Sequence, residues 1–148
     1  MSDRERTFVD TNVLVYAYDS TDSQKQKVAK ALLLELWGAG AGALSTQVLQ
    51  EFYTVATRKL DPPLIRGEAR KIVALYSTWQ IVCVDVPLIT SASQLEESQT
   101  LSFWDALVIQ AARRVGATRL MTEDLQHGRQ FGDLRIEDPF RIARDSIQ

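Results

Sequence analysis

Four acidic residues of this 148-residue chain stand where carboxylates can do chemistry: Asp10 and Asp124 each follow a short β-favouring run. Glu51 lies one turn into a predicted helix, and Asp105 lies in the first turn of a later one. In an α/β fold the carboxyl ends of the strands form one edge of the sheet, where all four can meet. Mg²⁺ and Mn²⁺ prefer carboxylate oxygens and leave positions for water and phosphate. Together the four acids indicate a divalent-metal site for a phosphate-containing substrate.

Each of these acids also has a purely structural interpretation. Asp10 can end its strand with an Asx turn or cap the following helix. Glu51 lies at the border of an apolar helix face, where a solvated flank would also place it. Asp105 and Ser102 have the spacing of a capping box, and Asp124 can cap a C-terminal turn.

Asp105 is the acid whose surroundings argue most against a purely structural role. Residues 103–104 and 106–109 are apolar, so it is the only charge in its run. Such a charge costs free energy unless it is paired or bound to a metal. Glu123, beside Asp124, is an equally good acid on composition alone.

The elements that must position these residues follow from apolar periodicity. Helices are predicted over residues 23–37, 47–59, 67–79, 88–98 and 103–115, and a further apolar stretch covers 13–18. Strands are predicted over 7–9, 43–45, 81–84, 119–122 and 134–136. This alternation predicts an α/β fold with a mostly parallel, five-stranded sheet and helices on both faces.

Two segments carry more detailed expectations. The apolar run 81–84 is typical of a strand covered on both faces, which would place Cys83 in the core. The helix over 67–79 has these candidate core positions: Ala69, Ile72, Val73, Leu75 and Tyr76.

Composition limits the class of protein. Length and a 45% hydrophobic content predict one globular domain over residues 1–148, without a membrane span. The charged N-terminus argues against a signal peptide, so we expect a cytoplasmic protein. One Cys and one His argue against a disulfide and against a thiolate–imidazole zinc site.

A net charge of −2 excludes nucleic-acid binding through a globally basic surface, but not through a local patch. The segment between residues 58 and 71 has a local excess of positive charge. Its candidate RNA contacts are Arg58, Lys59, Arg70 and Lys71.

Four segments resemble a known family. The segments 8–14, 45–52, 102–106 and 120–124 resemble, in order and spacing, the four motifs of PIN-domain nucleases. With the segments 124–128 and 134–140, the whole chain is similar to VapC-type toxins of bacterial toxin–antitoxin pairs.

The resemblance implies a Rossmann-like, three-layer α/β/α PIN fold and an endoribonuclease that depends on Mg²⁺ or Mn²⁺. It carries over four acids as catalytic groups and metal ligands: Asp10, Glu51, Asp105 and Asp124. Asn12 and Thr122 match supporting positions that orient these carboxylates. Glu123 is set aside, because the family places its acid where Asp124 stands. A VapB-like antitoxin partner and a homodimer are implied by the resemblance alone.

Two alternative functions are weighed against this one. A haloacid-dehalogenase-like phosphatase needs a second aspartate two residues after the first, where this chain has Asn12. The other alternative is a non-catalytic RNA-binding module on the PIN fold. The sequence leaves open whether one or two metal ions bind, and what His127 does.

Overall fold

The computed structural model describes residues 5–146 and contains a six-stranded sheet in the order β3-β2-β1-β4-β6-β5. The strands are β1 (Thr7–Val9), β2 (Gly42–Ser45), β3 (Gln80–Val82), β4 (Arg119–Met121), β5 (Gln130–Phe131) and β6 (Leu134–Glu137). All neighbouring pairs are parallel except β5 and β6. A mostly parallel sheet is therefore confirmed.

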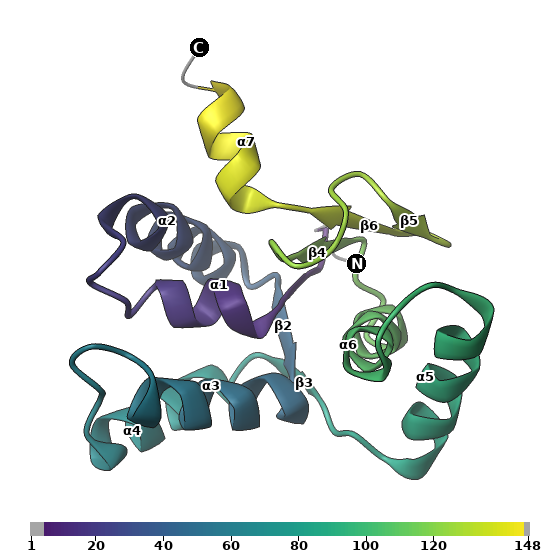
Figure 1. Cartoon of the computed structure of the whole chain (residues 1–148), viewed down its shortest axis with the longest axis horizontal. Coiled ribbons are helices and arrows are strands. Elements are labelled where there is room, and N and C mark those ends of the chain that lie inside the picture. The colour runs from purple at the N-terminus through teal and green to yellow at the C-terminus, as the bar shows by residue number, and fades with distance from the viewer. Residues whose placement is uncertain (1–4, 147–148) are drawn as a thin grey trace.

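Helices cover both faces of the sheet (Figure 1). They are α1 (Thr11–Tyr16), α2 (Ser23–Ala39), α3 (Thr46–Arg58), α4 (Arg66–Tyr76), α5 (Val86–Ser98), α6 (Phe103–Arg114) and α7 (Pro139–Ser146). The connections from β1 to β2 and from β2 to β3 run in one direction along the sheet, and the connection from β3 to β4 runs back. Right-handed crossovers then place α1 to α4 on one face and α5 and α6 on the other, as Figure 1 shows.

Side-chain caps fix where most of these helices begin. Asp10, Asp22, Ser45, Asp85 and Ser102 each accept a hydrogen bond from a backbone N–H in the first turn of the following helix. Such caps satisfy donors that have no partner within the helix, and each is worth about 1 kcal/mol. One of the capping residues, Asp10, is itself a predicted site residue, and Ser102 caps the helix that carries Asp105.

The core lies where the central strands meet the inner faces of the helices. Phe8, Leu44, Leu120 and Ile136 come from four adjacent strands and are fully buried. At one end, the rings of Trp37, Tyr76 and Trp79 pack on one another with centroids 5.0–5.4 Å apart. Trp79 also covers Gly42, where a Cβ would lie 2.3 Å from the indole, so β2 can start only with glycine.

The expectation of five strands is wrong by one. β5 is only two residues long and pairs antiparallel with β6 across a turn in which Gly132 has φ 63°. So short a strand has no periodicity that the sequence could reveal. Two short helices were likewise not predicted: α1, which contains most of residues 13–18, and the eight-residue α7.

Two core assignments are also wrong. The run 81–84 was expected to be covered on both faces, but β3 is an edge strand that ends at Val82, and Cys83 is exposed. Leu75 is 52% exposed, because it lies one residue away from the inward stripe of α4 that Ala69 and Tyr76 define.

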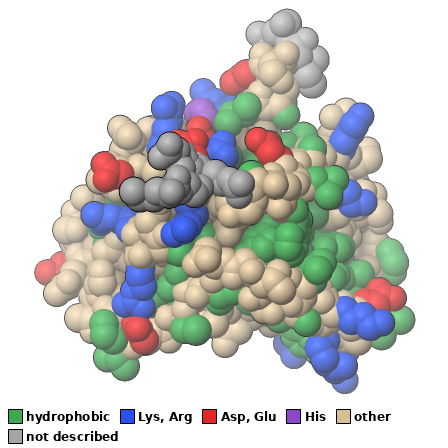
Figure 2. All heavy atoms as spheres, turned by 180° about the vertical axis from the view of Figure 1, so that it is seen from behind, with side chains coloured by type: hydrophobic (Ala, Val, Ile, Leu, Met, Phe, Trp, Pro, Cys, Tyr) green, Lys and Arg blue, Asp and Glu red, His purple; other side chains and the backbone are tan. Residues whose placement is uncertain are grey.

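Acidic and basic side chains are interspersed on the face shown in Figure 2, as the small net charge leads one to expect. Within residues 5–146, no helix combines the length and apolarity required to cross a membrane.

Candidate active site

The candidate site lies at the point where the chain reverses its direction along the sheet. β1 and β4 are neighbours, but the chain leaves β1 toward one face and reaches β4 from the other. Ligand sites of open α/β sheets form in the crevice beyond the carboxyl ends of such strands. Asp10 follows β1 here, and its backbone N–H donates to Met121 O, 3.0 Å away, at the end of β4.

Asp10 forms the floor of this site. Its side chain is held at both oxygens, because Oδ1 accepts from Thr11 N at 2.8 Å and Oδ2 accepts from the Thr122 hydroxyl at 2.9 Å. The pKa of Asp10 is raised to about 7, chiefly by burial and also by the charges of Asp124 and Glu51, while the two hydrogen bonds oppose the change. The carboxyl is thus rigidly placed but costly to ionise alone.

Asn12 joins the acids that follow β1 and β4. Its Nδ2 lies 3.1 Å from Asp124 Oδ2, 3.0 Å from Thr122 Oγ1 and 3.4 Å from Asp10 Oδ2. Thr122 Oγ1 also accepts from Asp124 N at 3.1 Å. Because an amide donor here bridges two carboxylates, an aspartate in its place would add repulsion, which weighs against the phosphatase alternative.

Glu51 and Asp105 approach the same place from α3 and α6. Burial raises the pKa of Glu51, and the charges of Asp105 and Asp124 raise it further. Burial also raises the pKa of Asp124, to which Asp105 contributes as well. The charges of Glu51 and Asp124 thus act on Asp10, and the charge of Asp105 acts on Glu51 and Asp124. Asp10 is buried, whereas Glu51 and Asp124 are exposed.

The Ser102–Asp105 pair forms half of a capping box. Ser102 Oγ accepts from Asp105 N at 3.1 Å. Within the described residues, no reciprocal bond joins the Asp105 carboxylate to Ser102 N, so that carboxylate is not consumed by capping.

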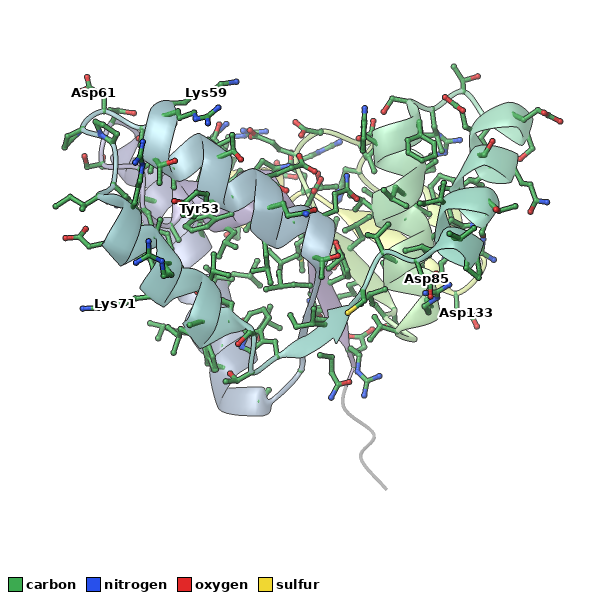
Figure 3. All side chains as sticks on the ribbon, turned by 90° about the horizontal axis from the view of Figure 1, so that it is seen from below. Tyr53, Lys59, Asp61, Lys71, Asp85 and Asp133 are labelled. Carbon is green, nitrogen blue, oxygen red and sulfur yellow. The ribbon has the colours of Figure 1, made fainter. Side chains whose placement is uncertain are left out.

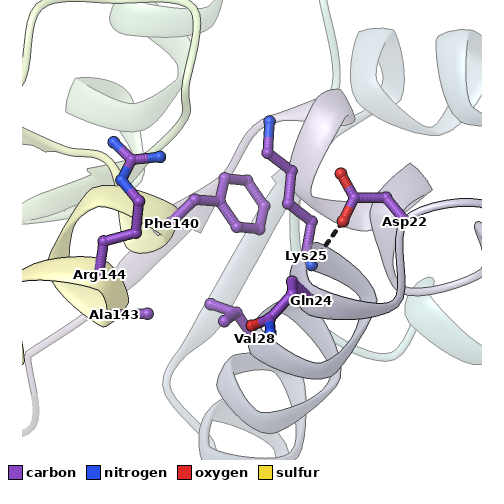
Figure 4. Close-up of a pocket in the computed structure, with 7 residues that line it drawn as sticks. All are labelled: Asp22, Gln24, Lys25, Val28, Phe140, Ala143 and Arg144. Carbon is purple, nitrogen blue, oxygen red and sulfur yellow. Dashed lines mark hydrogen bonds between the residues drawn. The ribbon is translucent and has the colours of Figure 1, made fainter. Parts of the chain in front are cut away.

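Glu123 is engaged elsewhere. Its carboxylate pairs with Lys25 Nζ at 2.6 Å, and the same ammonium lies 3.3 Å from Tyr16 OH and 5.2 Å from the Phe140 ring centroid. Figure 4 shows Lys25 beside Phe140 in a pocket of about 330 Å³ between α2 and α7. The charge of Glu123 is thus compensated by Lys25, whereas none of the ion pairs among the described residues includes Asp124.

Gln47 is a site-adjacent residue that the sequence analysis missed. It is buried, its Nε2 lies 3.4 Å from Trp104 O, and its polar side chain opposes the rise in the pKa of Glu51. It therefore links α3 to the start of α6. The sequence could have indicated this role, because Gln47 is a polar residue in the first turn of a predicted helix and lies four residues before Glu51.

The donor chemistry of the site fits a hard divalent cation, since its charged groups are carboxylates that repel one another. In the part of the chain that is described, however, no group of three or more His, Cys, Asp and Glu side chains is arranged so that it could hold a metal ion without movement. A bound cation therefore requires side-chain adjustment at the more exposed acids.

Of the predicted RNA-contacting cations, Arg58 and Lys59 lie at the end of α3 away from Glu51. Arg70, by contrast, lines a pocket with Thr46 and Gln50 near the start of α3. Arg58 is about 10 Å farther along α3 than Glu51, and Figure 3 shows Lys59 and Lys71 on the α3–α4 side, opposite Asp85 and Asp133. His127 accepts a hydrogen bond at Nδ1 from Asp138 N at 3.0 Å and thereby fastens the chain after β6.

Comparison with known proteins decides the family. Residues 7–130 match the PIN domain. The chain belongs to the PIN domain family. That membership confirms the predicted fold and the family resemblance, and no curated protein matches the chain significantly.

Solved structures of PIN-fold proteins resemble this one at low identity. VapC20 of Mycobacterium tuberculosis, described as a sarcin–ricin loop cleaving toxin, is 22% identical with a TM-score of 0.59, covering 77% of this chain and 86% of that one. A toxin–antitoxin complex from Klebsiella pneumoniae is 18% identical with a TM-score of 0.66, and the match covers 90% of this chain and 97% of that one. DNA-bound VapBC from Salmonella typhimurium is 16% identical with a TM-score of 0.63, and the match covers 92% of this chain and 99% of that one.

Proposed function

We propose that this PIN domain is a metal-dependent endoribonuclease that hydrolyses RNA phosphodiester bonds. The observation that carries the proposal is the charge repulsion among acids from four separate parts of the chain, near the β1–β4 switch point. A cluster of mutually repelling carboxylates is unfavourable for stability, and a function that uses their charge accounts for it. Similarity to a toxin described as cleaving the sarcin–ricin loop supports RNA as the substrate.

The proposed ligands of Mg²⁺ or Mn²⁺ are Asp10 and Asp105, with Glu51 and Asp124 alongside. When bound, the cation supplies a lower pKa for water and neutralises charge at the scissile phosphate. Thr122 and Thr11 hold Asp10 in place, and Asn12 holds Asp124.

Glu51 or Asp124 orients the attacking water as it loses its proton. The water oxygen forms a bond to phosphorus and the bond from phosphorus to the 3′ oxygen breaks. That 3′ oxygen takes up a proton, which leaves a 5′-phosphate and a 3′-hydroxyl.

Basic residues on the α3–α4 side provide attraction for the RNA backbone. Within residues 5–146, none of the ion pairs includes Arg58, Lys59, Arg70 or Lys71. Unpaired, exposed cations are available for phosphates, and their contacts position RNA without taking part in chemistry.

We further propose that the chain is the toxin of a toxin–antitoxin pair, forms a homodimer and binds a VapB-like antitoxin. Similar structures that contain toxin–antitoxin complexes support the assignment. The proposal predicts a small protein encoded in the adjacent upstream reading frame, and co-expression with it should give co-purification and relief of RNA cleavage. Light scattering of the purified chain tests the dimer.

RNA cleavage by the purified chain tests the proposed activity. We expect cleavage in millimolar Mn²⁺ and none in excess EDTA. Asp10→Ala and Asp105→Ala should each abolish cleavage, while Asp133→Asn should leave it unchanged, because Asp133 lies with Arg113 at the opposite end of α6 from Asp105.

Undiminished cleavage in EDTA would contradict the metal-dependent mechanism. RNA binding without any cleavage in Mn²⁺ would favour the non-catalytic RNA-binding module instead.

A further inference from the structure

Among the described residues, one large aromatic side chain is exposed, and it is the neighbour in sequence of one of the predicted site acids. Trp104 is 64% exposed and immediately precedes Asp105 in the first turn of α6. The chain's other tryptophans, Trp37 and Trp79, pack against each other and against Tyr76. An indole left in water forgoes the free energy that its burial would provide.

Trp104 is held in place rather than loosely attached. Its ring packs edge-to-face on Phe103 with centroids 5.3 Å apart, and Phe103 in turn packs on the core. The backbone carbonyl oxygen of Trp104 accepts from Gln47, whose side chain also lies near enough to Glu51 to influence its pKa. The main chain of Trp104 is therefore tied to α3, the helix that carries Glu51, while its ring rests on Phe103.

The surroundings of Trp104 favour a small planar occupant over a protein surface. The other exposed large apolar side chains of the described residues belong to α2, α4, α5, α7 or the residue before α4. Val86 and Ile89 lie near the start of α5, which packs beside the far end of α6, as the Arg114–Asp85 pair shows. The centre of a protein interface needs several adjacent apolar side chains, whereas one aromatic face suffices to stack a base.

We infer that Trp104 is a stacking platform for an unpaired RNA base next to the scissile phosphate. The inference rests on the proposed ribonuclease function and adds a binding residue to it. Each base in a duplex is already stacked on both faces, so only an unpaired nucleotide can offer a face to the indole. Trp104 thereby favours cleavage within single-stranded or looped RNA.

Three substitutions of Trp104 test this role on a randomised single-stranded RNA oligonucleotide, as substrate with Mn²⁺ and as ligand with EDTA. Trp104→Phe keeps an aromatic face and should stay within about threefold of wild type in kcat/KM and affinity. Trp104→Leu and Trp104→Ala should lose roughly tenfold or more of both. Val86→Ala, which removes an exposed apolar side chain far from the acids, is the matched control and should change neither.

A chain of abasic nucleotides of the same length supplies a readout that a structural role would not move. Wild type should bind the base-bearing chain better than the abasic one, and this preference should shrink in Trp104→Leu while its Tm stays at the wild-type value. Persistence of the preference in Trp104→Leu, or equal losses in Trp104→Phe and Trp104→Leu, would overturn the inference.

Two further outcomes separate this inference from the proposed function. An active enzyme in which Trp104→Leu cleaves RNA normally but loses affinity for the antitoxin would overturn base stacking and assign Trp104 to the protein partner. A wild-type protein that neither binds nor cleaves RNA would remove the proposed function, and this inference with it.

Discussion

Asp10 concentrates the conflict between stability and charge at this site. Its carboxyl is buried under hydrogen bonds that favour the ionised form, yet desolvation and neighbouring acids disfavour that form more strongly. The result is an acid whose pKa of about 7 lies far above that of the unfolded chain. This difference makes the stability of the metal-free protein depend on pH.

The pH dependence can be measured with Asp10→Asn in EDTA. Between the unfolded pKa of 3.8 and the folded value of about 7, the native state retains a proton that the unfolded chain releases. Wild-type stability relative to Asp10→Asn should therefore fall across this range, by at most about 4 kcal/mol, and level off above it. Urea unfolding of both proteins from about pH 4 to about pH 8 measures the difference. A difference that is constant or grows with pH would contradict this account of Asp10.

At the scale of elements, the Lys25–Glu123 pair ties α2 to the segment after β4 that carries Asp124. The side chains of the pair are only 29% and 21% exposed, against 37% and 51% for the Arg114–Asp85 pair. Less exposure to water means weaker screening of the attraction.

A double-mutant cycle with Lys25→Met and Glu123→Gln measures this attraction. We expect a coupling free energy of about 1 kcal/mol from urea unfolding. The corresponding cycle with Arg114→Met and Asp85→Asn is the control and should give a smaller value. If the more exposed pair couples as strongly, Lys25 does not act as a fastening of the Asp124 segment.

The helices and strands could be predicted from the sequence only in part. The long helices were predictable because their apolar stripes and caps, such as Asp22 and Ser102, are local signals. β5 and α7 were not, because such short segments are fixed by the contacts they make: β5 pairs with β6, and α7 packs on α2 through Phe140. Cys83 was misplaced because an apolar run does not reveal that its strand lies at the edge of the sheet.

The candidate site could be predicted only in part, for the same reason. That Asp10, Glu51, Asp105 and Asp124 could meet followed from their positions after strands and at helix starts. The contribution of Gln47 depends on the packing of α3 against the start of α6, which a single sequence does not specify. The catalytic roles of the four acids remain predictions.

At the scale of the whole molecule, the proposed function requires a protein with a net negative charge to bind a polyanion. The unpaired cations of α3 and α4 can do so only as a local patch, since the net charge is −2. Contacts of this kind appear in the salt dependence of binding rather than in the chemical step.

Arg70→Ala tests the patch. It should weaken RNA binding in EDTA for all sequences alike and reduce the slope of log affinity against log salt concentration by about one, without abolishing cleavage in Mn²⁺. Arg141→Ala, on α7, should leave the slope unchanged. An Arg70→Ala protein with the wild-type slope would exclude Arg70 from the RNA path.

The central claim is that four carboxylates from separate elements form one cation site, and thermal melting of Asp105→Asn tests it most directly. In EDTA, we expect Asp105→Asn to melt above wild type, because it relieves repulsion on Glu51 and Asp124 while Ser102 still accepts from the backbone N–H of residue 105. In millimolar Mn²⁺ the order should reverse, since a ligand at about 100 times its Kd stabilises the wild type by about 2.7 kcal/mol, most of which the variant forgoes. If Asp105→Asn melted below wild type in EDTA, or gained as much from Mn²⁺, Asp105 would be a structural residue and the four acids would not form one site.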